Sequence, residues 1–243
     1  MQHGKRYRQA REAIDRERLY TPVEAVRALK DFPGAKFDET VEVHFRLGLN
    51  VRHADEQLRG TLMLPHGTGR DVRVAVFAEG EKAKEAEEAG ADVVGSADLA
   101  KRVEEGFTDF DVAIATPDQM GNVGKLGRIL GPRGLMPNPK TGTVTFDIAK
   151  AVRDSKAGKL EYRTDRGANV HVSIGKKSFD ERALVENYAA LVDEIVRAKP
   201  AAAKGRYIKQ ITLTTTMGPG LHVDPARTKA IVEELEEAQA VPA

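Results

Sequence analysis

The chain of 243 residues is 41% hydrophobic and 31% charged, which is typical of a globular protein with one large domain or two smaller ones. It contains no cysteine, which excludes disulfides and thiolate metal sites and fits a reducing cytoplasm. No apolar stretch approaches the roughly 18 residues of a membrane span, and the arginine-rich N-terminal segment lacks the apolar region of a signal peptide, so we expect neither.

The net charge of +1 conceals a strong segregation of charge along the chain. Residues 79–111 contain eleven acidic and four basic residues, and residues 230–243 contain four glutamates and no base. The rest of the chain therefore carries a net charge of +12. Phosphate binding requires such a basic footprint, although an unevenly charged solvated surface explains the pattern equally well.

In chain order, a helix is expected at 22–29, and residues 41–47 alternate apolar and polar side chains as a half-buried strand does. A different pattern begins at residue 71. Strands there alternate with helices of about 10 residues, which indicates βαβ units and a parallel sheet. The expected strands are 71–77, 91–94 and 111–115, and the expected helices are 81–89, 97–105, 123–130 and 148–156.

After residue 159 the first pattern returns. Period-two alternation predicts strands at 160–163, 170–174 and 207–213, and a long amphipathic run predicts a helix at 181–198. Half-buried strands favour an antiparallel sheet that helices cover on one face.

An α/β region therefore lies inside an α+β region, and we predict two lobes. The first is a discontinuous α+β lobe with an antiparallel sheet, formed by residues 1–66 and 159–229. The second is an inserted Rossmann-like, three-layer α/β lobe, residues 67–158. We expect residues 230–243 to form a disordered acidic tail. Glycines near the two crossings are candidate hinge positions: Gly67, Gly69 and Gly158.

The βαβ pattern invites the alternative that the chain is a small-molecule enzyme with a nucleotide-binding domain, and the motifs argue against it. No G-x-G-x-x-G follows the first strand, and Gly121–Lys125 lacks the Walker spacing. The four serines and six histidines show no nucleophile or metal-ligand spacing. Asp109, Asp111 and Asp118 cluster near a strand end, where acids are more often caps or solvated turns. We expect no catalysis, cofactor or metal.

Residues 120–144 contain six glycines and no acid. Glycines allow close backbone approach, and spaced bases match a phosphate backbone, so this segment is a candidate for RNA contact rather than an incidental turn. Its four bases are Lys125, Arg128, Arg133 and Lys140.

Three other segments have features of an RNA surface, and each also has a purely structural interpretation. Residues 35–42 place the aromatic Phe37 beside Lys36, as in surfaces that stack RNA bases. Residues 162–171 predict a basic hairpin. Residues 214–220 form a run of threonines before Met-Gly-Pro-Gly, whose hydroxyls and tight turn suit phosphate or ribose.

Together these segments resemble the bacterial large-subunit ribosomal protein L-one (side-stalk protein) family over about residues 3–225. The resemblance is most specific at 124–128, 137–140 and 214–219, and it departs mildly at 164–167, where relatives often have Asn-Asp-Lys. It implies a discontinuous lobe that is the main rRNA-binding surface, and a hinge. The four bases of residues 120–144 are our weaker candidates for a secondary RNA contact. We predict these RNA-binding residues, most of them carried over from the family and the others from the same segments: Lys36, Phe37, Thr40, Glu42, Arg163, Asp165, Arg166, His171, Thr214, Thr216, Met217 and Gly218.

The resemblance also implies a function. The family is a structural constituent of the large subunit at the mobile side stalk, assists release of deacylated tRNA from the exit site, and represses translation of its own operon mRNA. The implied partners are therefore large-subunit rRNA, exit-site tRNA and that mRNA, on cytoplasmic ribosomes, with no membrane partner and a monomer off the ribosome. A repressor that acts only on mRNA is an alternative that the sequence does not separate. Glu42 repels phosphate, so its carboxylate should accept hydrogen bonds from ribose hydroxyls or base amino groups.

Overall fold

The computed structural model describes residues 4–15, 17–227 and 231, and the chain divides into two compact units. Unit 1 consists of residues 1–69 and 162–243, and unit 2 of residues 70–161. The predicted combination of an α+β and an α/β fold is confirmed. The predicted acidic tail lies outside the described residues, apart from Ile231.

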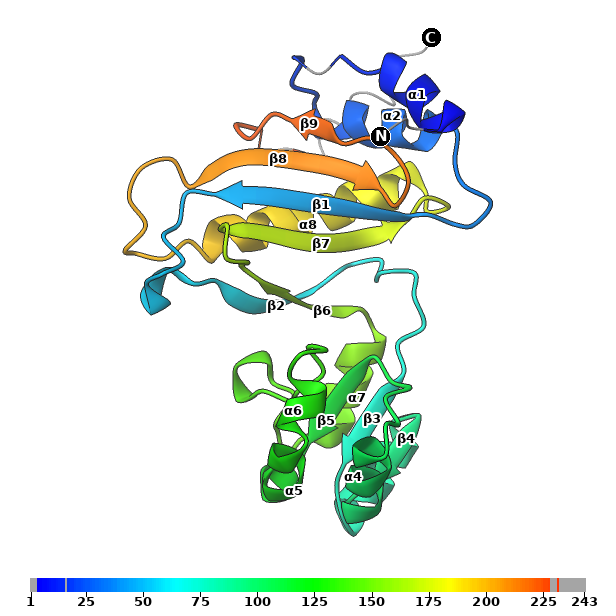
Figure 1. Ribbon diagram of the computed structural model, residues 1–243, viewed down its shortest axis with the longest axis vertical. Coiled ribbons are helices and arrows are strands. Elements are labelled where there is room, and N and C mark those ends of the chain that lie inside the picture. Colours follow the sequence, from blue (N-terminus) through cyan, green and yellow to red (C-terminus); the bar gives the residue numbers. More distant parts are fainter. Residues whose placement is uncertain (1–3, 16, 228–230, 232–243) are drawn as a thin grey trace. The chain divides into compact units, whose positions relative to one another are not determined.

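Unit 1 is built on a four-stranded antiparallel sheet in the order β7-β1-β8-β9 (Figure 1). Its strands are β1 (Thr40–Leu47), β7 (Asn169–Lys176), β8 (Ile208–Thr215) and β9 (Leu221–Val223). Helices α2 (Pro22–Asp31) and α8 (Glu181–Arg197) pack against each other and against this sheet.

Alternation along β1 decides which face of the sheet the helices cover. The apolar side chains of the strand are buried: Val41, Val43, Phe45 and Leu47. The polar ones lie on the opposite, open face: Thr40, Glu42, His44 and Arg46. Each strand residue points to the face opposite its neighbour's, so a strict apolar–polar sequence yields one packed and one solvated face.

Local signals position the two covering helices. Thr21 and Glu24 form a capping box at the start of α2, in which the Thr21 hydroxyl accepts from the Glu24 amide at 3.2 Å and Glu24 accepts from the Thr21 amide at 3.1 Å. Pro22 occupies the first helical position, where a missing N–H has no cost. Asp180 caps α8 in a similar way, accepting from the Glu181 amide at 3.0 Å.

Unit 2 is a three-layer arrangement, as predicted. Its parallel sheet has the order β4-β3-β5, formed by β3 (Val74–Phe77), β4 (Val93–Gly95) and β5 (Val112–Ala115). One core cluster joins the sheet to α3 (Glu81–Glu88) and α7 (Ile148–Lys156). The other joins it to α4 (Ala97–Glu104), α5 (Met120–Lys125) and α6 (Gly127–Leu130).

Several elements differ from the prediction. The expected helix at 123–130 is two short helices, α5 and α6, in a stretch that three glycines weaken as a continuous helix. Helix α1 (Lys5–Glu12) was not predicted because it buries only Ala10 and so shows no apolar stripe. Short elements were also missed: β2 (Arg59–Met63), β9 and the 3₁₀ turns η1 (Ala54–Glu56), η2 (Pro117–Gln119) and η3 (Pro139–Thr141).

The predicted basic hairpin at 162–171 is wrong. Strand β6 (Lys159–Arg163) pairs with β2 in a separate two-stranded sheet, whereas β7 pairs with β1. The turn between β6 and β7 therefore joins two sheets. Ala168, which has a φ of 60°, lies in this turn and redirects the chain.

We predicted that the chain passes from one lobe to the other after residues 66 and 158. In the structure the boundaries between the units fall after Gly69 and Glu161. The three candidate hinge glycines all adopt positive φ: Gly67 (63°), Gly69 (66°) and Gly158 (102°). Side chains rarely tolerate this region, which accounts for glycine at each position.

Within unit 1, the fully buried Asn187 of α8 holds the segment that precedes the first crossing. Its amide oxygen accepts from the His66 amide at 3.0 Å, and its nitrogen donates to the carbonyls of Gly67 (3.0 Å) and Ile174 (2.7 Å). No helix within the described part of the chain has the length and apolar character needed to cross a membrane.

Replacing Asn187 with leucine should lower the free energy of unfolding of unit 1 by about 2–4 kcal/mol, because three backbone groups lose their partner. All five tyrosines lie in unit 1 and the chain has no tryptophan, so tyrosine fluorescence during urea denaturation reports this unit alone. As a control, Asn50→Leu at an exposed site should change stability by less than about 1 kcal/mol. An equal effect of the two substitutions would contradict this role of Asn187.

Candidate nucleic-acid interface

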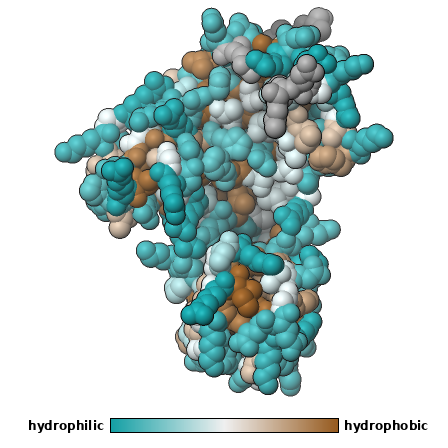
Figure 2. Space-filling view, viewed as in Figure 1, coloured by the Kyte–Doolittle hydropathy of each residue, from teal (hydrophilic) through white to brown (hydrophobic). Residues whose placement is uncertain are grey.

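The open face of the unit 1 sheet carries four rows of polar side chains. Strand register places these side chains directly opposite one another on neighbouring strands, and Figure 2 shows this part of unit 1 covered largely by hydrophilic residues. The rows are Lys176–Thr40, Ser173–Glu42–Thr214, His171–His44–Thr212–His222 and Asn169–Arg46–Gln210.

Four of the predicted RNA-binding residues lie in these rows, namely Thr40, Glu42, His171 and Thr214. Sequence reasoning missed their neighbours, most clearly His44 and Arg46. The signal was present, because period-two alternation from Thr40 and Glu42 along β1 leads directly to both.

A buried carboxylate joins two segments at the edge of this face. Glu39, only 2% exposed, accepts from the amides of Ala35 (2.5 Å) and Met217 (3.1 Å) and bonds the side chain of Thr215. Burial alone would raise the pKa of Glu39, but these hydrogen bonds together with nearby Lys177 hold it below the usual value. The loop that contains Lys36 and Phe37 is thereby tied to the turn after β8.

The turn after β8 is also bonded to the start of β1. The Thr40 amide donates to the Thr216 hydroxyl at 3.0 Å, and the Thr216 amide donates to the Thr40 carbonyl at 3.1 Å. A Cβ at Gly218 would lie 2.4 Å from the Thr215 hydroxyl, so this position requires glycine. Phe37 and Met217 are 55% and 60% exposed, so both segments present a large apolar side chain at this edge of the face.

The threonine run does not present three hydroxyls outward. Thr215 is buried, because it has the opposite parity in β8 to Thr214 on the open face, and Thr216 is exposed after the strand ends. The expectation that the hydroxyls of the threonine run are offered to RNA is therefore only partly right: Thr215 supports the turn, and Thr214 and Thr216 face outward.

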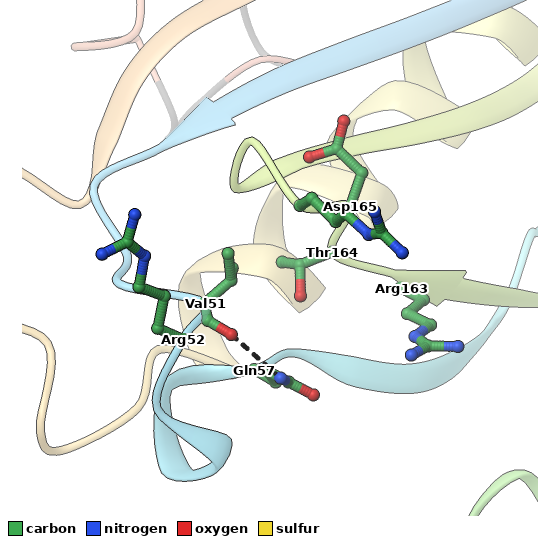
Figure 3. Close-up of a pocket in the computed structure, with 7 residues that line it drawn as sticks. Val51, Arg52, Gln57, Arg163, Thr164 and Asp165 are labelled. Atoms are coloured by element: carbon green, nitrogen blue, oxygen red, sulfur yellow. Dashed lines mark hydrogen bonds between the residues drawn. The ribbon is translucent and has the colours of Figure 1, made fainter.

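A pocket of about 300 Å³ lies beside the β6–β7 turn, and three arginines contribute to its lining (Figure 3). Arg52 follows β1 and Arg163 belongs to β6, and they stand on either side of Thr164; Arg166 lies in the turn. None of the three guanidinium groups has a carboxylate within ion-pair distance among the described residues. The only acid of the lining is Asp165.

Asp165 is committed to the turn itself. Its carboxylate accepts from the amides of Gly167 (2.8 Å) and Asn169 (2.7 Å) and from the Asn169 side chain (3.0 Å). Burial opposes ionisation, but the bonds from Asn169, Gly167 and His171 hold the pKa of Asp165 below its usual value. Sequence reasoning identified Arg163, Asp165 and Arg166 but missed Arg52, which pairing between distant strands brings to the same pocket.

The predicted secondary contacts lie in unit 2. Lys125 ends α5, Arg128 lies in α6, Arg133 follows it and bonds Thr108, and Lys140 lies in η3. All four are exposed.

The three aspartates considered for catalysis do not cluster. Asp109 and Asp111 precede β5 and pair with Arg73 and Arg70, each at 2.5 Å, whereas Asp118 follows that strand. Across the residues that the structure describes, no group of three or more histidine or acidic side chains is arranged to hold a metal ion.

Comparison with known proteins identifies a family whose sequences this chain matches. The profile of the ribosomal protein L1p/L10e family matches residues 29–219. Bacterial relatives carry the name large ribosomal subunit protein uL1. The chain is 64% identical to that of Thermobifida fusca (94% of this chain, 97% of the relative), 63% to that of Rubrobacter xylanophilus (92% and 97%) and 58% to that of Mycolicibacterium smegmatis (95% and 98%).

Replacing Glu39 with glutamine should lower the stability of unit 1 at pH 7 by about 1–3 kcal/mol, because one acceptor of the buried site is lost. The pKa of Glu39 in the folded protein lies below its unfolded value near 4.5, so ionised Glu39 stabilises the fold at pH values above about 4.5. This contribution is lost as the pH falls through the folded pKa. In urea denaturation followed by tyrosine fluorescence, the difference from wild type should therefore be constant above pH 5 and shrink below about pH 4. A difference independent of pH would contradict this account.

Proposed function

The chain belongs to the ribosomal protein L1p/L10e family, a structural family without enzymatic activity, and from that premise we propose that it binds large-subunit rRNA at the side stalk through the open face of unit 1. It serves as a structural constituent of the large ribosomal subunit. The observation that carries the RNA contact is the combination of a polar sheet face with two exposed apolar side chains, Phe37 and Met217, held at its edge by Glu39.

The chemistry of the face suits folded RNA. Its rows offer hydroxyl, amide and imidazole groups at Thr40, Gln210 and His171, which match ribose hydroxyls and base edges. Glu42 serves as an acceptor for these RNA donors. Phe37 provides a ring on which an unstacked base or a ribose packs.

The arginine pocket supplies the electrostatic part of binding. Arg52, Arg163 and Arg166 are available to an anion because Asp165 bonds backbone amides rather than these arginines, and guanidinium groups match phosphate geometry. The pocket follows the last residue of β1, whereas the Met217 turn adjoins the first. Seven residue steps of about 3.3 Å separate these ends, so the pocket and the turn engage different nucleotides.

We propose finer functions on the resemblance to the family. The protein assists release of deacylated tRNA from the exit site and represses its own operon mRNA, and one surface of unit 1 serves both rRNA and mRNA. Lys125, Arg128, Arg133 and Lys140 make a secondary RNA contact, supported by their exposure in an acid-free segment. The protein acts on cytoplasmic ribosomes, is a monomer off the ribosome, and uses Gly67, Gly69 and Gly158 as hinge positions.

Replacing Met217 with tryptophan should weaken binding to an in vitro transcript of bacterial large-subunit rRNA at least about tenfold, because a larger side chain blocks close approach of the turn. Circular dichroism should be unchanged, since Met217 is mostly exposed. The control is Met63→Trp in β2, at another exposed methionine of unit 1 (49% exposed), which should retain affinity. Unchanged binding by the Met217 variant would remove this turn from the interface.

Replacing Arg52 with glutamine should weaken rRNA binding about three- to tenfold and lower the slope of log Kd against log salt by about 1, the signature of one lost phosphate contact. Arg18→Gln removes the same charge from unit 1 at an arginine paired with Glu24, and it should leave the slope unchanged. Equal slopes for both variants would show that the pocket does not hold a phosphate.

A further inference from the structure

Two imidazole rings face each other in the middle of the open face. Nδ1 of His44 on β1 lies 2.9 Å from Nδ1 of His171 on β7, and the ring centroids are 5.0 Å apart. The two residues are directly opposite in antiparallel register, so the backbone holds the rings together. Such a contact is a hydrogen bond only when one nitrogen donates and the other accepts.

Each outer ring nitrogen faces a carboxylate. Nε2 of His44 lies 3.7 Å from Glu42, and Nε2 of His171 lies 3.5 Å from Asp165. The carboxylates favour a proton on each Nε2. The bond between the two Nδ1 atoms then needs one further proton, so the pair shares a single positive charge. A second charge would set two N–H groups head to head and break the contact.

The remaining neighbours do not supply another negative charge. On β1 the charged groups that share the face with the pair are Glu42 and Arg46, and on the β6–β7 turn Asp165. On β8 the neighbour is Thr212, whose hydroxyl bonds His222 of β9 at 3.2 Å. On β7 the neighbours are the neutral Asn169 and Ser173. Burial and the facing His171 lower the pKa of His44 more than Glu42 raises it, which agrees with a pair that resists a second charge.

We propose that His44 and His171 form one proton-sharing unit in which His44 positions His171 for RNA contact, and that RNA binding takes up a proton at this pair. The proposal rests on the proposed rRNA-binding function. With Glu42 and Asp165 ionised, the four side chains carry a net charge of −2 when the pair is neutral and −1 when it holds the shared charge. RNA phosphates that approach this face favour the shared charge, which keeps the contact between the rings.

Affinity for RNA rises as the pH falls. The complex has the higher pKa, so the added affinity is complete below the pKa of the free pair and is lost as pH rises through the pKa of the complex. One proton changes the affinity at most about tenfold per pH unit.

The first test needs no RNA. Histidine side chains of the full chain are titrated by NMR in wild type, His44→Gln and His171→Gln, with His66→Gln, at an exposed histidine outside the rows of the open face, as a control. We expect two steps separated by more than about one pH unit in wild type, one ordinary step in each single variant, and no change in the control. If His44 and His171 titrate independently and ignore each other's removal, no shared proton exists.

The second test measures affinity for the same rRNA transcript from pH 8 to pH 5.5 at constant salt. Wild type and His66→Gln should bind more tightly by about three- to tenfold per pH unit within that range, and His171→Gln should not. His44→Asn, whose amide restores a hydrogen bond to His171 without titrating, should recover affinity but not the pH dependence.

The outcomes separate the two proposals. Wild-type affinity that is tight but independent of pH would overturn the proton linkage while leaving the proposed function standing. Absence of rRNA binding by wild type at every pH would overturn the function, and the linkage with it, whereas the NMR titration still decides whether the pair shares a proton.

Discussion

The candidate interface depends on the carboxylate of Glu39. This group bonds the amide of Met217, which is 178 residues away in sequence, and that of Ala35 in its own loop. Burying a carboxylate without such partners would lower the free energy of unfolding by several kcal/mol. The amides of the loop and the turn therefore stabilise the charge of Glu39, and the charge in turn holds these two segments in place. Phe37 and Met217 remain exposed because the backbone beneath them is held in this way.

The open sheet face follows from a second constraint. Helices α2 and α8 cover the apolar side of the strands, and the polar side keeps its cross-strand rows. The charges of the face are arranged by hydrogen bonding rather than by ion pairs alone. Asp165 is occupied by the β6–β7 turn, which leaves Arg52, Arg163 and Arg166 available to an anion, and Glu42 and Asp165 flank the histidine pair.

Much of the fold could be predicted from the sequence because the signals are local. Period-two alternation gave β1 and its two faces, and glycine stops gave the βαβ order of unit 2. Pairing between distant strands leaves no local signal, so the separate sheet of β2 and β6 was missed and a hairpin was wrongly expected at 162–171. For the same reason neither the bond from Glu39 to Met217 nor the approach of Arg52 to Arg163 could be predicted. The RNA-binding residues themselves were predicted mainly from family resemblance, and their role stays a prediction. The position of His44 on the open face could have been predicted from the apolar–polar alternation along β1 alone.

The most direct test of the central claim is ultraviolet crosslinking of the full chain to bacterial large-subunit rRNA, with each crosslinked residue identified by mass spectrometry. The account predicts crosslinks concentrated at 36–44, 163–171 and 214–218, with a weaker group at 125–140. Crosslinks confined to 125–140, or located on the outer surfaces of α2 and α8, would contradict it.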